Sequence, residues 1–98
     1  MSERATLTVR DNQEKNRYEV LVESGVVVGF SEYKKRGGLL ILTHTEVDDA
    51  FEGQGVGSAL ARGALDDARS RGLSVRPLCP FIRAYIDGHP EYLDLVSG

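Results

Sequence analysis

The sequence predicts an α+β (mixed α/β) fold, in which an antiparallel β-meander is followed by a strand, a loop, a helix, a strand and a last helix. Three observations predict it. Apolar residues alternate with period two in the first third of the chain, and a glycine-rich loop follows a long apolar strand. Behind that loop the spacing becomes helical. A length of 98 residues indicates a single domain, 1–98.

The first half of the chain has the pattern of half-buried strands. Leu7 and Val9 alternate with polar neighbours, and so do Tyr18, Val20 and Val22. Turn-forming residues at 11–13, 23–25 and 37–38 separate these strands and a third one, expected over 26–33. The continuous apolar run 39–42 predicts a central strand buried on both faces, and this strand continues to 44–47.

The second half alternates helix and strand. Small and apolar residues recur at helical spacing from the glycine loop to about Arg71, and Gly72 is expected to end that helix. The segment 73–78 is a short strand, with a break or sheet edge at Pro77. Pro80 suits the first turn of a last helix over 81–86. A closing turn follows from His89, with Tyr92, Leu93 and Leu95 packed back on the body.

Composition excludes several classes of function. The net charge of −3 argues against a general nucleic-acid-binding protein, which needs clustered Lys and Arg on its surface. No apolar stretch has the length of a membrane span, so no membrane partner is expected. A single cysteine forms no internal disulfide, which favours the reducing cytoplasm. His44, His89 and Cys79 do not have a metal-ligand spacing, and no metal is expected.

The loop Gly53-Gln54-Gly55-Val56-Gly57-Ser58 is the most informative segment. Alternating glycines let several amide groups converge at the positive end of a helix, where a diphosphate binds well. A Walker-type phosphate loop is excluded because no lysine follows the second glycine. The dinucleotide fingerprint is excluded because Ser58 occupies its third small position.

Gly55 and Gly57 match the two small positions of the coenzyme A loop, Arg/Gln-x-x-Gly-x-Gly/Ala, of the GCN5-related N-acetyltransferases (GNATs), which this segment resembles. Glu52 stands where that family prefers Arg or Gln, and we expect its carboxylate to point away from a diphosphate. The helices that commonly follow strand one in GNATs are missing. The chain is therefore similar to a small GNAT branch of about a hundred residues. The segments that carry this match are His44-Thr45-Glu46-Val47, the loop, Pro77-Leu78-Cys79-Pro80-Phe81 with Tyr85, and His89-Pro90-Glu91-Tyr92.

The resemblance implies acetyl-CoA as cofactor and places it. In GNAT folds the fourth and fifth strands, here 39–47 and 73–78, splay apart, and the pantetheine arm lies in the gap. Amide groups around Thr45 to Val47 would pair with pantetheine. The diphosphate would be held by the backbone of Gln54, Gly55, Val56 and Gly57, with a hydroxyl from Ser58.

Two groups of residues are candidates for acyl-transfer chemistry. Strand alternation puts His44 and Glu46 on one face and Thr43, Thr45 and Val47 on the other. His44 or Glu46 would accept the amine's proton, or they are an ordinary strand-end histidine and a solvated glutamate.

Cys79 follows the fifth strand, where the resemblance places the acetyl group. It is a nucleophile, a proton donor to the departing thiolate, or an inert core residue.

Tyr85 is a candidate general acid by the same resemblance, because larger GNATs use a tyrosine in this last segment. Alternatively, it is an aromatic cover of the cofactor channel. His89 is expected to cap the turn that follows it.

The leading hypothesis is an acetyl-CoA-dependent N-acetyltransferase acting on a primary amine, whether a small molecule, a polyamine, a protein lysine or an N-terminus. Acidic residues near the loop, Asp48, Asp49 and Glu52, would attract such a cation. The alternative is a coenzyme A-binding module with little catalysis of its own that acts with a partner. A monomer or weak homodimer is expected.

Overall fold

The computed structural model describes residues 6–51 and 53–97. Within them the first four strands form an antiparallel meander, and the fifth pairs in parallel with the fourth, in the order β1-β2-β3-β4-β5. The strands are β1 (Thr8–Asn12), β2 (Arg17–Leu21), β3 (Val27–Arg36), β4 (Leu39–Val47) and β5 (Ser74–Pro77). The helices are η1 (Asp49–Phe51), α1 (Val56–Ser70), α2 (Pro80–Asp87) and η2 (Pro90–Leu95). The predicted fold class and element order are confirmed.

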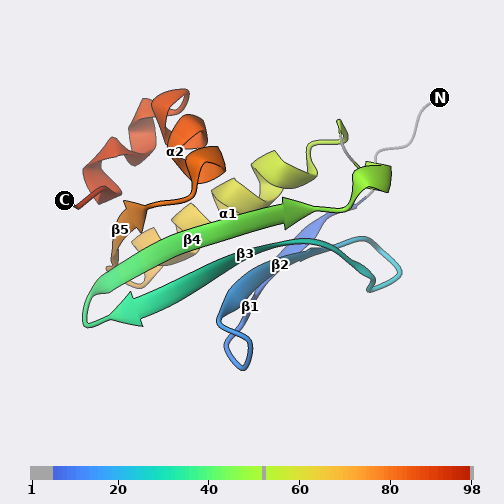
Figure 1. Cartoon of the computed structure of the whole chain (residues 1–98), viewed down its shortest axis with the longest axis horizontal. Coiled ribbons are helices and arrows are strands. Elements are labelled where there is room, and N and C mark those ends of the chain that lie inside the picture. The colour runs from blue at the N-terminus through green and yellow to red at the C-terminus, as the bar shows by residue number, and fades with distance from the viewer. Residues whose placement is uncertain (1–5, 52, 98) are drawn as a thin grey trace.

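A turn of four residues joins β1 to β2, so no helix intervenes between them. One face of the sheet is covered by α1, which contacts all five strands. Figure 1 shows α1 behind the sheet, with α2 and η2 beyond β5. The other face, here called the open face, carries no helix in the described part of the chain.

Helix α1 lies close to the sheet because its inner side chains are small. Its buried residues include three alanines, Ala61, Ala64 and Ala68. At Gly63 a Cβ atom would lie 2.7 Å from Val9 of β1, so only glycine permits this approach. The helix ends at Ser70, and Gly72 follows its C-cap with a positive φ of 72°, which allows the amide of Leu73 to reach back to the Ala68 carbonyl.

Two hydroxyl–carboxylate bonds and the ion pairs of Arg71 connect α1 and the first three strands. Tyr18 of β2 donates to Asp67 of α1 at 2.6 Å, and Tyr33 of β3 donates to Asp11 at 2.5 Å. Arg71 pairs with both carboxylates. Burial and these carboxylates raise the pKa of each tyrosine well above its usual value, so both hydroxyls keep their protons.

Several details differ from the sequence prediction. Strand 39–42 is buried on one face only, through Leu40 and Leu42, because the open face has no covering layer. The segment from Pro90 is a short 3₁₀ helix; Tyr92 and Leu95 pack inward, whereas Leu93 is exposed. The side chain of His89 does not cap that helix, because its Nδ1 lies 2.7 Å from the Tyr85 carbonyl of the preceding helix. No helix in the described ranges is long and apolar enough to cross a membrane.

Candidate active site

Strands β4 and β5 part at the level of a β-bulge in β4. Glu32 of β3 pairs with His44 and Tyr33 pairs with Leu42, so Thr43 has no partner and forms a β-bulge. Pairing with β5 stops at the same level, where Leu42 lies opposite Pro77, which has no amide hydrogen to donate. The Leu42 carbonyl accepts the amides of both Leu78 and Cys79 at 3.0 Å, which turns the chain away into α2.

The bulge also decides which side chains of β4 face α1. Leu40 and Leu42 point to that side and are buried. Without the extra residue, alternation from Leu42 would also place His44 and Glu46 on the α1 side. With it, Thr45 and Val47 face α1, and His44 and Glu46 face the open side.

A cavity of about 490 Å³ lies between the free end of β4 and the start of α1. It is bounded by strand, glycine loop, first helical turn and α2. Its lining residues are Thr45, Val47, Phe51, Gly53, Gly55, Val56, Gly57, Ser58 and Phe81. Six of the seven residues expected to bind the cofactor therefore surround one cavity, and Gln54 is the exception.

The glycine loop presents its backbone to this cavity. Gly53 and Gly55 have φ values of 80° and 79°, in the left-handed region that other residues avoid. Gly55 precedes the helix without a side-chain cap, and the first intrahelical bond runs from the Ala59 amide to the Gly55 carbonyl. The amides of 55–58 thus have no acceptor within the helix. Glu52, expected to point away, lies outside the described residues.

Phe81 closes the cavity from α2. A Cβ atom on Gly57 would lie 2.6 Å from Cζ of the Phe81 ring, so the ring rests directly on the glycine backbone. The ring is still 42% exposed, because its outer side borders solvent. No sequence pattern gives a role to Phe81, since its contact with Gly57 joins segments far apart in the chain.

Peptide groups of β4 face the gap left by β5. The amide of Asp48 donates to the Val28 carbonyl of β3 at 2.8 Å. Because successive residues of a strand direct their backbone groups to opposite edges, those of Val47 and Thr45 point toward the gap. These are donors and acceptors available to an extended, amide-containing ligand.

Cys79 lies beside the inner end of this gap. It directly precedes α2 and is 4% exposed. Its Sγ donates to Thr45 Oγ1 at 3.2 Å, and Thr45 Oγ1 lies 3.0 Å from Ser31 Oγ of β3. The side chain of Arg83 in α2, a cation four residues along the chain, makes no hydrogen bond with the Cys79 thiol among the described contacts.

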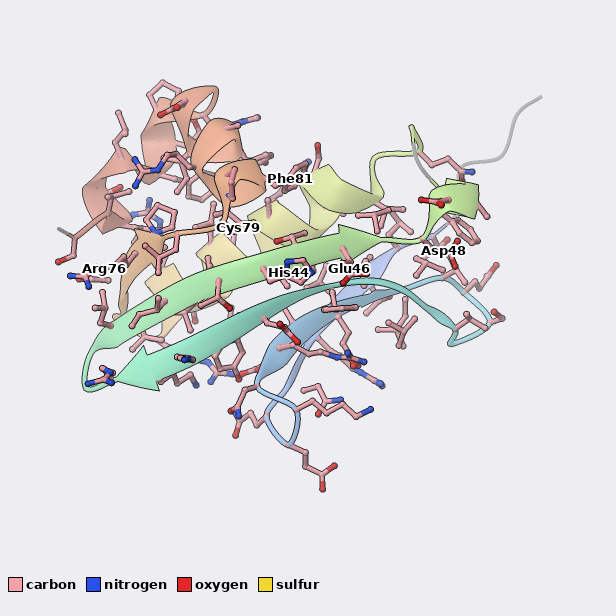
Figure 2. The ribbon with its side chains drawn as sticks, in the orientation of Figure 1. His44, Glu46, Asp48, Arg76, Cys79 and Phe81 are labelled. Atoms are coloured by element: carbon pink, nitrogen blue, oxygen red, sulfur yellow. The ribbon has the colours of Figure 1, made fainter. Side chains whose placement is uncertain are left out.

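His44 and Glu46 form a separate pair on the open face. Their side chains meet at 2.8 Å and are 52% and 62% exposed. Figure 2 shows them in front of β4, with Asp48 beyond the end of the strand and Cys79 at the junction of β5 and α2. The candidate proton acceptors and the candidate thiol thus lie on opposite faces of β4.

Tyr85 is not among the residues that line the cavity. Its ring stacks on His89 with centroids 3.9 Å apart, and Tyr92 lies at 6.1 Å. Hydrogen bonding with Tyr85 raises the pKa of Arg62 on α1. The structure thus places Tyr85 in an aromatic cluster between α1, α2 and η2. In the same described part of the chain, no three His, Cys, Asp or Glu residues form a candidate metal site.

Part of this chain is similar in sequence to curated proteins. Protein NATD1 from Xenopus tropicalis is 38% identical over 55 residues, which cover 54% of this chain and 50% of that protein; human Protein NATD1 is also 38% identical, with 49% of it covered. The chain spans about half the length of these curated relatives.

Two solved structures share the fold. A GCN5-like putative N-acetyltransferase from Staphylococcus aureus superimposes with a TM-score of 0.69 at 20% identity, covering 99% of this chain and 92% of that one. Ard1 from Thermoplasma volcanium gives 0.56 at 33% identity, covering 69% and 46%. The sequence model described as GCN5-related N-acetyl-transferase matches residues 17–95, and the chain belongs to this family.

Proposed function

We propose that this protein is an acetyl-CoA-dependent N-acetyltransferase that transfers an acetyl group to a primary amine. The observation that carries the proposal is the single cavity that joins the end of β4, beyond its pairing with β5, to the amide-rich start of α1. Family membership supports acetyl transfer in general. Beyond acetyl transfer in general, we propose the residues of the site and a primary amine as the acceptor.

The lining of the cavity fits a diphosphate and its pantetheine arm. The amides of 55–58 lie at the positive end of α1, where anions bind favourably. The peptide groups of Thr45 and Val47 suit the amides of pantetheine. Gly57 leaves the backbone uncovered where a side chain would collide with Phe81. When bound, acetyl-CoA supplies an acetyl group activated as a thioester.

Cys79 is the residue we assign to the acyl end of the site; it does not line the cavity itself but bonds to Thr45, which does. A buried thiol that donates to Thr45 carries a proton that it can supply to a departing thiolate. The second role is acceptance of the acetyl group by the sulfur itself, for which the start of α2 offers a positive end. Tyr85 is a weaker candidate for the acid because its ring packs against His89 and Tyr92, and it makes no hydrogen bond like that of Cys79 to a residue of the cavity wall.

His44 and Glu46 would take the amine's proton from the open face. Their exposure lets a large acceptor approach, and the paired carboxylate favours a cation at this position. A primary amine must lose a proton before it attacks, and a solvent-connected pair can pass that proton on. The acceptors compatible with this face are a small amine, a polyamine, and a protein lysine or N-terminus.

The second candidate function is a coenzyme A-binding module that needs a partner. Two observations on the described residues favour it: the open face has no wall to hold an acceptor, and no basic side chain is found among the residues that line the cavity.

Release of coenzyme A in the presence of an amine panel separates the two candidates. The enzyme hypothesis predicts release that depends on the amine, a large loss of rate in Cys79→Ala and a loss in Glu46→Gln. Cys79→Ser serves as the matched control for packing. Tight binding of acetyl-CoA without amine-dependent release would support the binding module. Full activity of Cys79→Ala would remove Cys79 from the mechanism.

A further inference from the structure

Three side chains from three elements form one line of hydrogen bonds. Ser31 of β3 lies 3.0 Å from Thr45 of β4, and Thr45 lies 3.2 Å from Sγ of Cys79 at the start of α2. Thr45 also lines the proposed cofactor cavity. The hydrogen bonds therefore connect Ser31 in the core with Thr45 on the cavity wall and, through Thr45, with Cys79.

Ser31 occupies a position that packing alone would give to an apolar residue. It is 0% exposed and lies on the sheet face covered by α1, beside Tyr33. Apart from tyrosines and the cysteine, the buried polar residues of 6–51 and 53–97 are Ser31 and Glu19. Glu19 is held by two arginines and an asparagine, whereas the Ser31 side chain bonds to Thr45. A buried hydroxyl is costly unless it is bonded, so this bond keeps Ser31 compatible with the core.

The strand register explains why the two hydroxyls meet. Ser31 and Thr45 are directly opposite on β3 and β4. The Asp48–Val28 backbone bond shows that Gly29 and Val47 form a pair without mutual hydrogen bonds, and Ser31 and Thr45 are the next such pair. Side chains in these pairs approach more closely than in hydrogen-bonded pairs.

Because a hydroxyl can both donate and accept, these hydrogen bonds can form with the sulfur either as a thiol or as a thiolate. With the thiol protonated, Sγ donates to Thr45, whose own proton turns to Ser31. With the proton gone, Thr45 turns its hydroxyl to the charged sulfur, and Ser31 donates to Thr45 in its place. In the Ser31–Thr45 bond either oxygen can be the donor, as this exchange requires.

We propose that Ser31 is a positioning residue that acts through Thr45 on Cys79, so that the thiol can lose and regain its proton at the acyl end of the cavity. The proposal rests on the proposed function in assigning the reactive group to Cys79. It adds two residues, one buried and one on the cavity wall, that set the state of that group.

Alkylation of the thiol tests this without acetyl-CoA. The chain has one cysteine, so the added mass reports Cys79 alone. At neutral pH, Thr45→Val should slow alkylation by iodoacetamide by about tenfold, the effect of one hydrogen bond lost from a charged group. Ser31→Ala should slow it by about threefold, and the alkylation rate of the urea-unfolded chain should be the same in the wild type and both variants. Ser31→Ala should then have no further effect in the Thr45→Val background.

Two matched variants control for packing. Thr45→Ser keeps the hydroxyl and should retain the wild-type pH–rate profile. Thr43→Val removes a hydroxyl of the same strand that donates to the Glu32 carbonyl instead, and should change nothing. Equal effects of Ser31→Ala with and without the Thr45 hydroxyl would overturn the proposal. So would an unchanged profile in Ser31→Ala alone, which is informative even if Thr45→Val does not fold. A chain that shows the coupling but never releases coenzyme A would refute the enzyme hypothesis separately.

Discussion

Gly57 is a single residue at which the shape of the cavity is fixed by the absence of a side chain. It lies in the first turn of α1, and its backbone supports the Phe81 ring. The ring is partly exposed and can rotate, so the contact shapes the cavity more than it stabilises the fold.

Gly57→Ala should therefore separate binding from stability. The new methyl group displaces Phe81 from its position, and acetyl-CoA affinity should fall by about tenfold, or about 1.4 kcal/mol. The free energy of unfolding should not fall, because alanine is the better helix former by about 0.5–1 kcal/mol. Gly38→Ala is the control, since a Cβ there meets nothing within 4 Å. Equal affinity of Gly57→Ala and wild type would contradict the role given to this contact.

Loop and helix α1 act together as one element. Left-handed φ at Gly55 aims the amides of the first helical turn into the cavity, and no side chain caps them. Alanine at such a position costs about 1–2 kcal/mol, wherever in the chain it occurs.

Gly55→Ala and Gly25→Ala form a matched pair on this point. Gly25 has a φ of 90°, a Cβ added there would meet nothing within 4 Å, and the residue is not among those that line the cavity. Both variants should lose about 1–2 kcal/mol in chemical denaturation. Only Gly55→Ala should also weaken acetyl-CoA binding in calorimetry. A similar loss of acetyl-CoA affinity in both variants would show that the left-handed conformation of Gly55 is not specifically required for binding.

Strand β4 shows how far the sequence alone could predict this site. Alternation correctly separates His44 and Glu46 from Thr45 and Val47, because it depends only on neighbours in the chain. Alternation cannot reveal the bulge at Thr43, which depends on pairing with β3 and decides which of the two sets faces α1. Ser31 and Phe81 were missed for the same reason: their contacts with Thr45 and Gly57 join segments far apart in the chain.

The stability of the whole molecule depends on pH, because several of its polar side chains have shifted pKa values. Burial and a hydrogen bond to Asp66 raise the pKa of Tyr92 to about 12, and the pKa values of Tyr18 and Tyr33 are raised as well. For Glu19, burial alone would raise the pKa, but bonds from Arg17, Arg10 and Asn12 bring it below its usual value.

Stability should accordingly be flat near neutral pH and fall on both sides. The tyrosines are neutral in the fold, so their contribution is complete below their unfolded pKa of about 10 and is lost as pH rises above it. Glu19 contributes as an anion, so its contribution is present above about pH 4.3 and is lost as pH falls. Urea denaturation across pH should show this dome, and Tyr92→Phe should reduce the alkaline slope. A slope unchanged by Tyr92→Phe would contradict the assignment.

An amide-resolved NMR titration with acetyl-CoA tests the central claim most directly, because it reads the position of the ligand residue by residue. The account predicts shifts concentrated at 45–47 and 54–58, with smaller ones at Phe81 and few on the open face. Intact mass of the same sample would then show whether an acetyl group has moved to Cys79. No shifts at about millimolar ligand, or shifts confined to the open face, would contradict a coenzyme A site between β4 and α1.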